Sequence, residues 1–178
     1  MFDVDRMLEH IAARVGSARF APASADAVRA SENRLGVQLP TLLRRCLMEI
    51  GNGGFGPGHG LLGVSGGFSD DLGTLAEASF AMRDTSGSSP GGTGVCVPFC
   101  EFGCGIYYCL HSPVDEAALS IHEDGQLWPQ IVTLERFFEM WLAGEDVLNV
   151  GEFDLIELEG INPFTQRACV YRRRRRVR

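Results

Sequence analysis

Apolar residues recur every three or four positions in several parts of the chain, and this spacing places them on one face of a helix. The clearest example follows Thr133, where leucine, phenylalanine and tryptophan give a wide apolar face. Capping residues mark helix ends: Ser24 precedes one apolar stretch, and Gly36 and Gly144 follow two others. The pattern predicts helices over residues 3–15, 25–35, 41–50, 75–83 and 133–142.

Short apolar runs separated by turn residues predict strands, most of them between the last two predicted helices. Asp124 and Gly125 lie between two such runs, and an Asp-Gly pair in this position is typical of a β-hairpin. The connections are short, which indicates antiparallel pairing. The predicted strands are 61–64, 95–100, 106–111, 119–122 and 126–132. We therefore expect a single α+β domain, in which an antiparallel sheet of about five to six strands packs against N-terminal helices and a late helix.

The C-terminal part of the chain has a weaker pattern. The apolar residues between Phe153 and Leu158 fit either an edge strand or a segment packed across the body. Beyond them, six of the 16 arginines fall within Arg172–Arg178, and charge runs at chain ends are usually solvated. We expect the domain to span residues 1–165 and residues 166–178 to form a basic, flexible tail. A nucleic-acid or membrane patch is the alternative interpretation of this tail.

Charge is distributed unevenly along the chain. All 16 basic residues are arginine, and 23 residues are acidic. Without the six C-terminal arginines, ten arginines face 23 acids, a net charge of 10 − 23 = −13. An acidic body argues against a nucleic-acid-binding face and suits a basic partner. The chain contains no run of 18 apolar residues, so no membrane-spanning helix is predicted. The acidic N-terminus is unlike a signal peptide. We therefore expect a cytoplasmic protein without a nucleic-acid or membrane partner.

Three patterns suggest chemistry, and none of them is convincing. Residues Gly51–Gly56 match G-x-G-x-x-G, but the dinucleotide fingerprint needs a strand before it and a helix after it, and the pattern here predicts the reverse. Cys109 and His111 would share one face of a strand, without a third group to orient them. Four cysteines with His111 and His122 are spaced too loosely for a typical zinc site; they are Cys96, Cys100, Cys104 and Cys109. We expect no catalytic residue, no metal and no cofactor, which favours a binding protein over an enzyme.

The ordered set of motifs resembles the SUKH superfamily, which includes the fungal Smi/Knr regulators and many bacterial immunity proteins. The similar residues are a Leu-Pro step that opens a helix, an Asn-Gly-Gly exit from that helix and a later Val-Pro step in a strand. They assign a structural role to Leu39, Pro40, Asn52, Gly53, Gly54 and Pro98. The resemblance covers residues 24–144. It implies an α+β fold, no catalysis and, as function, binding and neutralisation of a cognate toxin, possibly a nuclease.

A toxin that attacks nucleic acid often has a basic surface, so acidic residues in predicted loops or turns are the candidates for contact. They are Asp70, Asp71, Glu101, Glu123 and Asp124. The resemblance leaves a regulatory or scaffold protein of the Smi/Knr type as the alternative function. A metal-binding protein or an enzyme built on the cysteine-rich strands is a further alternative. The sequence does not decide the oligomeric state.

Overall fold

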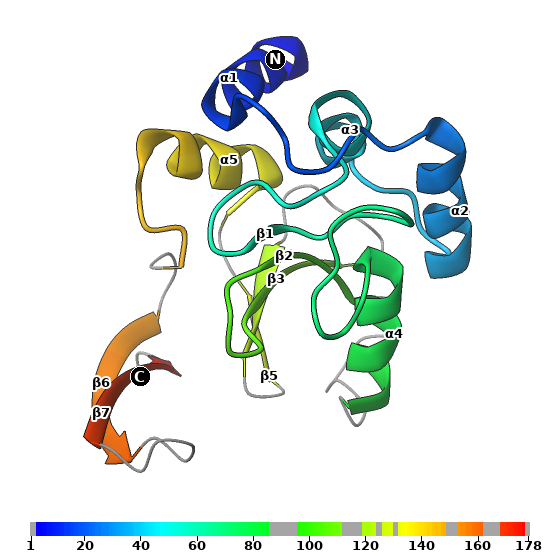
Figure 1. Ribbon diagram of the computed structural model, residues 1–178. Coiled ribbons are helices and arrows are strands. Elements are labelled where there is room, and N and C mark those ends of the chain that lie inside the picture. Colours follow the sequence, from blue (N-terminus) through cyan, green and yellow to red (C-terminus); the bar gives the residue numbers. More distant parts are fainter. Residues whose placement is uncertain are drawn as a thin grey trace.

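The computed structural model describes residues 3–85, 96–111, 119–123, 126–129, 132–148, 153–161 and 168–176. Helices α1, α3 and α5 lie above the sheet in Figure 1, with α2 and α4 along its right-hand side. The helices are α1 Val4–Val15, α2 Ala25–Leu35, α3 Thr41–Arg45, α4 Leu75–Thr85 and α5 Leu134–Ala143. No helix within these described ranges is both long and apolar enough to cross a membrane.

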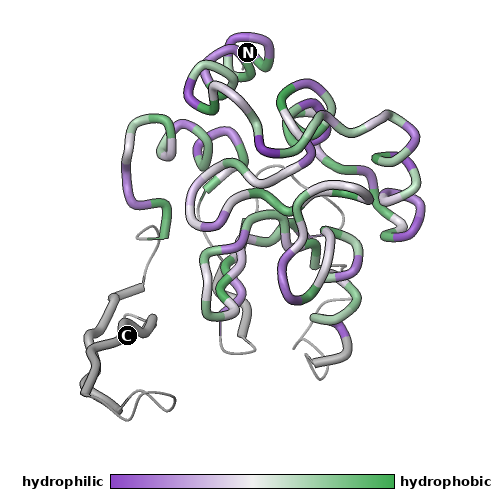
Figure 2. The backbone as a smooth tube through the Cα atoms, in the orientation of Figure 1, coloured by the Kyte–Doolittle hydropathy of each residue, from purple (hydrophilic) through white to green (hydrophobic). Residues whose placement is uncertain are grey.

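The helix boundaries follow the capping residues that the sequence indicates. The hydroxyl of Ser24 accepts a hydrogen bond from the backbone N–H of Ala27 at the start of α2, and Gly36 ends that helix in the left-handed conformation, with φ 73°. Thr133 and Gly144 cap the two ends of α5 in the same way. Along the helices, hydrophobic and hydrophilic residues alternate in the tube of Figure 2. Because these signals are local, the predicted helix positions are confirmed within one or two residues.

The predicted helix over residues 41–50 differs in its second half. An α-helix over Thr41–Arg45 passes directly into a π-helix, η1, over Cys46–Ile50. The backbone N–H of Gly51 bonds the carbonyl of Cys46, five residues back, which defines the wider turn. The carbonyl of Leu47 instead accepts the backbone N–H of Ala23 at 2.8 Å. The π-turn therefore ties the segment before α2 to the end of this helix.

Within the residues that the structure describes, five antiparallel strands form the main sheet in the order β1-β2-β3-β4-β5. They are β1 Gly60–Leu61, β2 Cys96–Glu101, β3 Tyr107–His111, β4 Leu119–Glu123 and β5 Gln126–Pro129. The predicted α+β class and antiparallel sheet are confirmed, although the strand expected over 61–64 has only two residues. Glu123 pairs with Gln126, so β4 and β5 form the predicted hairpin. Pro98 lies in an inner strand, and the register shifts between Pro98 and Cys100, because a residue without an N–H is accommodated at a bulge.

Aromatic side chains from the sheet and α5 make up the centre of the core. Phe137 contacts Phe99 and Tyr108 edge-on, with ring centroids 5.2 and 4.9 Å apart. All three are fully buried, as expected for an aromatic stripe that belongs to the core. The bulge at Pro98 supplies Phe99 to this cluster. The hydroxyl of Tyr108 also donates to the carbonyl of Val147 at 2.5 Å, which holds the chain after α5 against the sheet.

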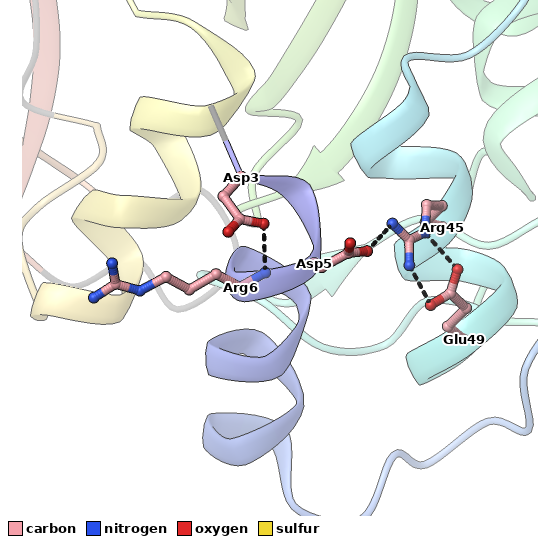
Figure 3. A network of polar contacts seen from close by, with 5 residues as sticks. All are labelled: Asp3, Asp5, Arg6, Arg45 and Glu49. Carbon is pink, nitrogen blue, oxygen red and sulfur yellow. Dashed lines mark hydrogen bonds and ion pairs between the residues drawn. The ribbon is translucent and has the colours of Figure 1, made fainter. Parts of the chain in front are cut away.

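Helix α1 is attached to the rest of the body by arginine. In Figure 3 the guanidinium of Arg45 lies between the carboxylates of Asp5, on α1, and Glu49, on η1. Its nitrogens lie 2.6 Å from an oxygen of each acid. On the other side of α1, Arg14 lies over the ring of Trp141, 5.1 Å from its centroid. These contacts and the buried residues Met7, Leu8 and Ile11 add α1 to the core.

The C-terminal residues form a separate two-stranded sheet. Strand β6, Phe153–Ile161, pairs antiparallel with β7, Ala168–Arg176, along nine residues each. Strand β7 thus covers most of residues 166–178, the segment for which the sequence predicts a flexible tail. In Figure 1 this hairpin lies to one side of the body, at the lower left.

Candidate partner-binding surface

A loop before α4 presents two of the candidate acidic residues and is fixed to the sheet by one of them. One carboxylate oxygen of Asp70 accepts the hydroxyl of Tyr107 at 2.5 Å. The other accepts the backbone N–H of Leu72 at 2.8 Å. Asp70 also forms a backbone bridge with Gly73. Because Tyr107 belongs to β3, the loop over 70–73 is held in place by an inner strand of the sheet.

Glu101 at the end of β2 fixes two neighbouring turns. One of its carboxylate oxygens accepts the backbone N–H of Gly103 at 2.6 Å. The other lies 2.5 Å from Nδ1 of His59, and the backbone N–H of His59 donates to the carbonyl of Glu101 at 2.8 Å. Glu101 is buried, with 7% of its surface exposed, so it supports the surface and is not available for contact.

Sheet register brings these groups together at one end of the strands. Glu101 is paired with Tyr107, which is paired in turn with His122 of β4. Glu123 follows His122 at the same end of the sheet. We call this region the sheet-end surface and define it by His59, Asp70, Asp71, Leu72, Glu101, Tyr107 and Glu123. Asp124, the fifth acidic candidate, lies outside the described residues.

Tyr107 acts as a hydrogen-bond donor in this arrangement. Burial raises the pKa of its hydroxyl well above the ordinary value, and the hydrogen bond to Asp70 raises it further. The negative charges of Asp70, Glu101 and Asp71 act in the same direction. The hydroxyl therefore stays protonated and keeps the carboxylate of Asp70 in one position.

The tip of the loop is exposed on this rigid support. Asp71 and Leu72 are both exposed, and within the described ranges Leu72 is the large hydrophobic residue that remains accessible, at 38%. The side chain of His59 is also accessible, at 64%. The arrangement offers acidic and apolar groups to a partner at positions that the sheet determines.

Asn52 organises the loops behind this surface. It is buried, at 4% exposure. Its side-chain oxygen accepts the backbone N–H of Val64 at 2.8 Å, and its amide nitrogen donates to the carbonyl of Ser65 at 3.2 Å. The glycines around it leave no room for side chains: a Cβ on Gly67 would lie 2.2 Å from Cγ of Asn52. Asn52 therefore packs closely against Gly63 and Gly67.

Gly53 and Gly54 both have positive φ, 79° and 74°, and they let the chain after η1 lie close to the backbone around Gly63. A Cβ on Gly53 would lie 2.6 Å from the backbone nitrogen of Gly63. The segment lies between η1 and β1, and the next helix begins only at Leu75. It therefore lacks the strand-turn-helix geometry that a dinucleotide site requires.

The Leu-Pro step is held by a buried carboxylate. Oε1 of Glu32, on α2, accepts the backbone N–H of Leu39 at 2.8 Å and two guanidinium N–H groups of Arg44. Pro40 takes the N-cap position, and the helix begins at the next residue, Thr41. Glu32 thus links α2, the Leu-Pro step and α3.

The four cysteines of the β2–β3 region do not converge on one point. Cys100 and Cys109 are buried, Cys96 is half-buried, and Cys104 is exposed in the turn between the strands. His111 contacts the hydroxyl of Ser120 through Nε2. In the part of the chain that the structure describes, no group of three or more histidine, cysteine, aspartate or glutamate side chains is arranged to hold a metal ion.

The sequence model of the SMI1/KNR4 family (SUKH-1) matches residues 22–144. The chain belongs to this family. The match begins before α2 and ends at the cap of α5, so it contains the sheet-end surface and all six motif residues of the Leu-Pro, Asn-Gly-Gly and Val-Pro steps. Helix α1 and the β6–β7 hairpin lie outside the SUKH-1 match. No curated protein and no solved structure matches the chain significantly.

The acidic residues of the SUKH-1 domain could be predicted from the sequence, but the residues that hold them in place could not. Tyr107 and His59 were missed because neither residue belongs to a motif, and their partners lie 37 and 42 positions away in the chain. Leu72 was missed because a single leucine in a loop carries no periodic signal. Only the two adjacent acids before it indicated that this loop could matter.

Proposed function

We propose that this protein is an immunity protein of the SUKH-1 family, which binds a basic toxin through the sheet-end surface and blocks it without catalysis. Members of the family are generally non-catalytic binding proteins. The observation that carries the proposal is the exposed pair Asp71 and Leu72 on a loop that Asp70 fixes to the sheet. A bacterial origin and a place in the cytoplasm, where such a toxin would be neutralised, belong to the same proposal.

The two exposed residues supply different parts of the binding free energy. Carboxylates attract a basic partner over a distance, which raises the association rate and selects against acidic partners. An apolar side chain that becomes desolvated at the centre of an interface contributes more to the affinity itself. A loop that is already held in its bound conformation loses little conformational entropy on binding.

The other candidate acids have distinct roles in this proposal. Asp70 and Glu101 hold the loops, since each accepts hydrogen bonds from groups of the body. Glu123 adds negative charge at the same end of the sheet. Asp124 remains a sequence prediction.

The test is co-expression with the product of the neighbouring reading frame in the source genome. We expect that product to be toxic alone, and the wild-type chain to restore growth and to co-purify with it. Growth inhibition that persists, with no complex, would refute the immunity function. A complex with a non-toxic neighbour would instead favour the regulatory or scaffold role of the Smi/Knr type.

A variant pair tests the surface separately. Asp71→Asn with Leu72→Ala is expected to weaken the complex at least about tenfold, which corresponds to about 1.4 kcal/mol. Glu9→Gln, which removes an exposed acid on α1, is the matched control and should change the dissociation constant less than twofold. If the double variant binds as tightly as the control, the immunity function can still hold, but the sheet-end surface is rejected as the binding site.

A further inference from the structure

The C-terminal hairpin places five arginines at consecutive positions of one strand. Arg172–Arg176 form the end of β7, in register with β6. A strand rises about 3.4 Å per residue, so these five positions span about 14 Å along the ribbon. A flexible tail would spread the same charges over many conformations, whereas the ladder fixes the five positions along one strand, alternating between its two faces.

The opposite strand compensates only part of this charge. Glu157 is paired with Arg172 and Asp154 with Arg175. The remaining three arginines, Arg173, Arg174 and Arg176, are paired with apolar residues of β6. Successive positions of a strand lie on opposite faces, so Arg172, Arg174 and Arg176 are on one face of the ribbon and Arg173 and Arg175 on the other. Both faces therefore carry arginines that no acidic residue of β6 opposes.

The C-terminal part of the chain has a net positive charge, whereas the rest of the chain has a net negative charge. Residues 153–178 contain seven arginines and three acids, a net charge of 7 − 3 = +4. Residues 1–152 contain nine arginines and 20 acids, a net charge of 9 − 20 = −11. In Figure 1 the hairpin lies to one side of the body. A polyanion would therefore be attracted to the hairpin and repelled by the body.

We propose that the β6–β7 hairpin binds the phosphate backbone of nucleic acid. A two-stranded antiparallel ribbon has the width that the major groove of double-stranded DNA admits. The guanidinium group of arginine forms paired hydrogen bonds with a phosphate. An acidic membrane surface attracts the same charges, but it has no groove that the ribbon would fit. This inference revises the expectation of no nucleic-acid partner, which rested on the acidic body and a flexible tail.

The test measures binding of the full chain to a fluorescein-labelled duplex of mixed sequence, followed by fluorescence anisotropy at increasing salt. Three to five phosphate contacts predict a slope of log affinity against log salt of about −3 to −4.5. Raising the salt from 50 to 200 mM should then weaken binding about 60- to 500-fold. No binding at 50 mM salt would overturn the proposal.

Two triple variants with the same change in net charge separate the hairpin from the body. Arg173→Gln, Arg174→Gln and Arg176→Gln together should reduce the salt slope by about three units. Arg19→Gln, Arg29→Gln and Arg34→Gln, at exposed positions of the body, should leave it unchanged. Equal losses in both variants would assign the effect to net charge and reject the hairpin site.

Two further measurements keep the result interpretable. Replacing the same three hairpin arginines by lysine preserves the charge, so the slope should stay within one unit of wild type even if glutamine perturbs the strand. Tighter binding to phosphatidylserine vesicles than to the duplex would overturn the proposal in favour of a membrane surface. The proposed binding of a toxin to the sheet-end surface does not depend on whether the hairpin binds nucleic acid or vesicles, because the two surfaces share no residue.

Discussion

Replacement of Asn52 by alanine tests whether this side chain organises the loops behind the sheet-end surface. The change leaves the buried N–H of Val64 without its acceptor, which costs about 1–3 kcal/mol. Loss of the 3.2 Å hydrogen bond to Ser65 costs a further ~0.5–1.5 kcal/mol. The contact with the carbonyl of Val64 is 3.4 Å long and adds little. We expect Asn52→Ala to lower the free energy of unfolding by about 2–4 kcal/mol.

Urea and thermal unfolding, followed by circular dichroism, measure this loss. For a chain of this size each kcal/mol lowers the melting temperature by about 2–4 °C, so the expected shift is about 4–16 °C. Asn33, exposed on α2, provides the matched control. Asn33→Ala should change the free energy of unfolding by no more than about 0.5 kcal/mol.

Asn52→Asp separates the hydrogen-bond geometry from simple loss of packing. The carboxylate keeps an acceptor for Val64, but it replaces the amide donor by an oxygen that faces the carbonyl groups of Val64 and Ser65. It also buries a charge, which is unfavourable without a partner. We therefore expect Asn52→Asp to be at least as unstable as Asn52→Ala at pH 7. An aspartate variant as stable as wild type would refute the assigned orientation of the amide.

Two further predictions concern the sheet. Tyr107→Phe removes the hydrogen bond to Asp70 and should lower the free energy of unfolding by about 1–2 kcal/mol, measured by urea unfolding. It should also weaken the toxin complex, measured by titration calorimetry, although Tyr107 is buried; unchanged affinity would show that the loop does not need this support. Burial lowers the pKa of His111 in the folded protein, whereas the pKa of a histidine in the unfolded chain is about 6.5. The stability that the neutral ring provides is present above that pH and is lost as the pH falls below it. Wild type should therefore lose more stability than His111→Gln between pH 7.5 and 5.5 in urea titrations, and parallel curves would contradict this reasoning.

Local signals account for the parts of the fold that the sequence predicted. Ser24 and Gly36 fix the limits of α2 through hydrogen bonds and backbone conformations within a few residues. The β4–β5 hairpin was visible because a turn pair separates two apolar runs. The Asn-Gly-Gly motif was recognised by its letters, and its structure explains the first glycine, since Gly53 has positive φ and a Cβ there would lie 2.6 Å from the backbone nitrogen of Gly63.

The features that the sequence did not predict depend on distant partners. The π-turn of η1 accompanies a hydrogen bond from Ala23 to Leu47, which no pattern within residues 41–50 reveals. Tyr107 and Asp70 are 37 residues apart, so each looks ordinary in its own segment. The C-terminal strand was missed for a related reason: a run of arginines has no strand periodicity, and the ladder depends on the partner strand β6.

The wide turn of η1 also sets the length of the segment that precedes Asn52. A π-turn contains one residue more than an α-turn. Deleting one residue between Cys46 and Gly51 would leave the bond between these two residues spanning four positions, as in an ordinary α-helix, so Asn52 would keep its place. The deletion would instead remove the free carbonyl that accepts the N–H of Ala23. The extra residue of this stretch thus serves the contact with the segment before α2.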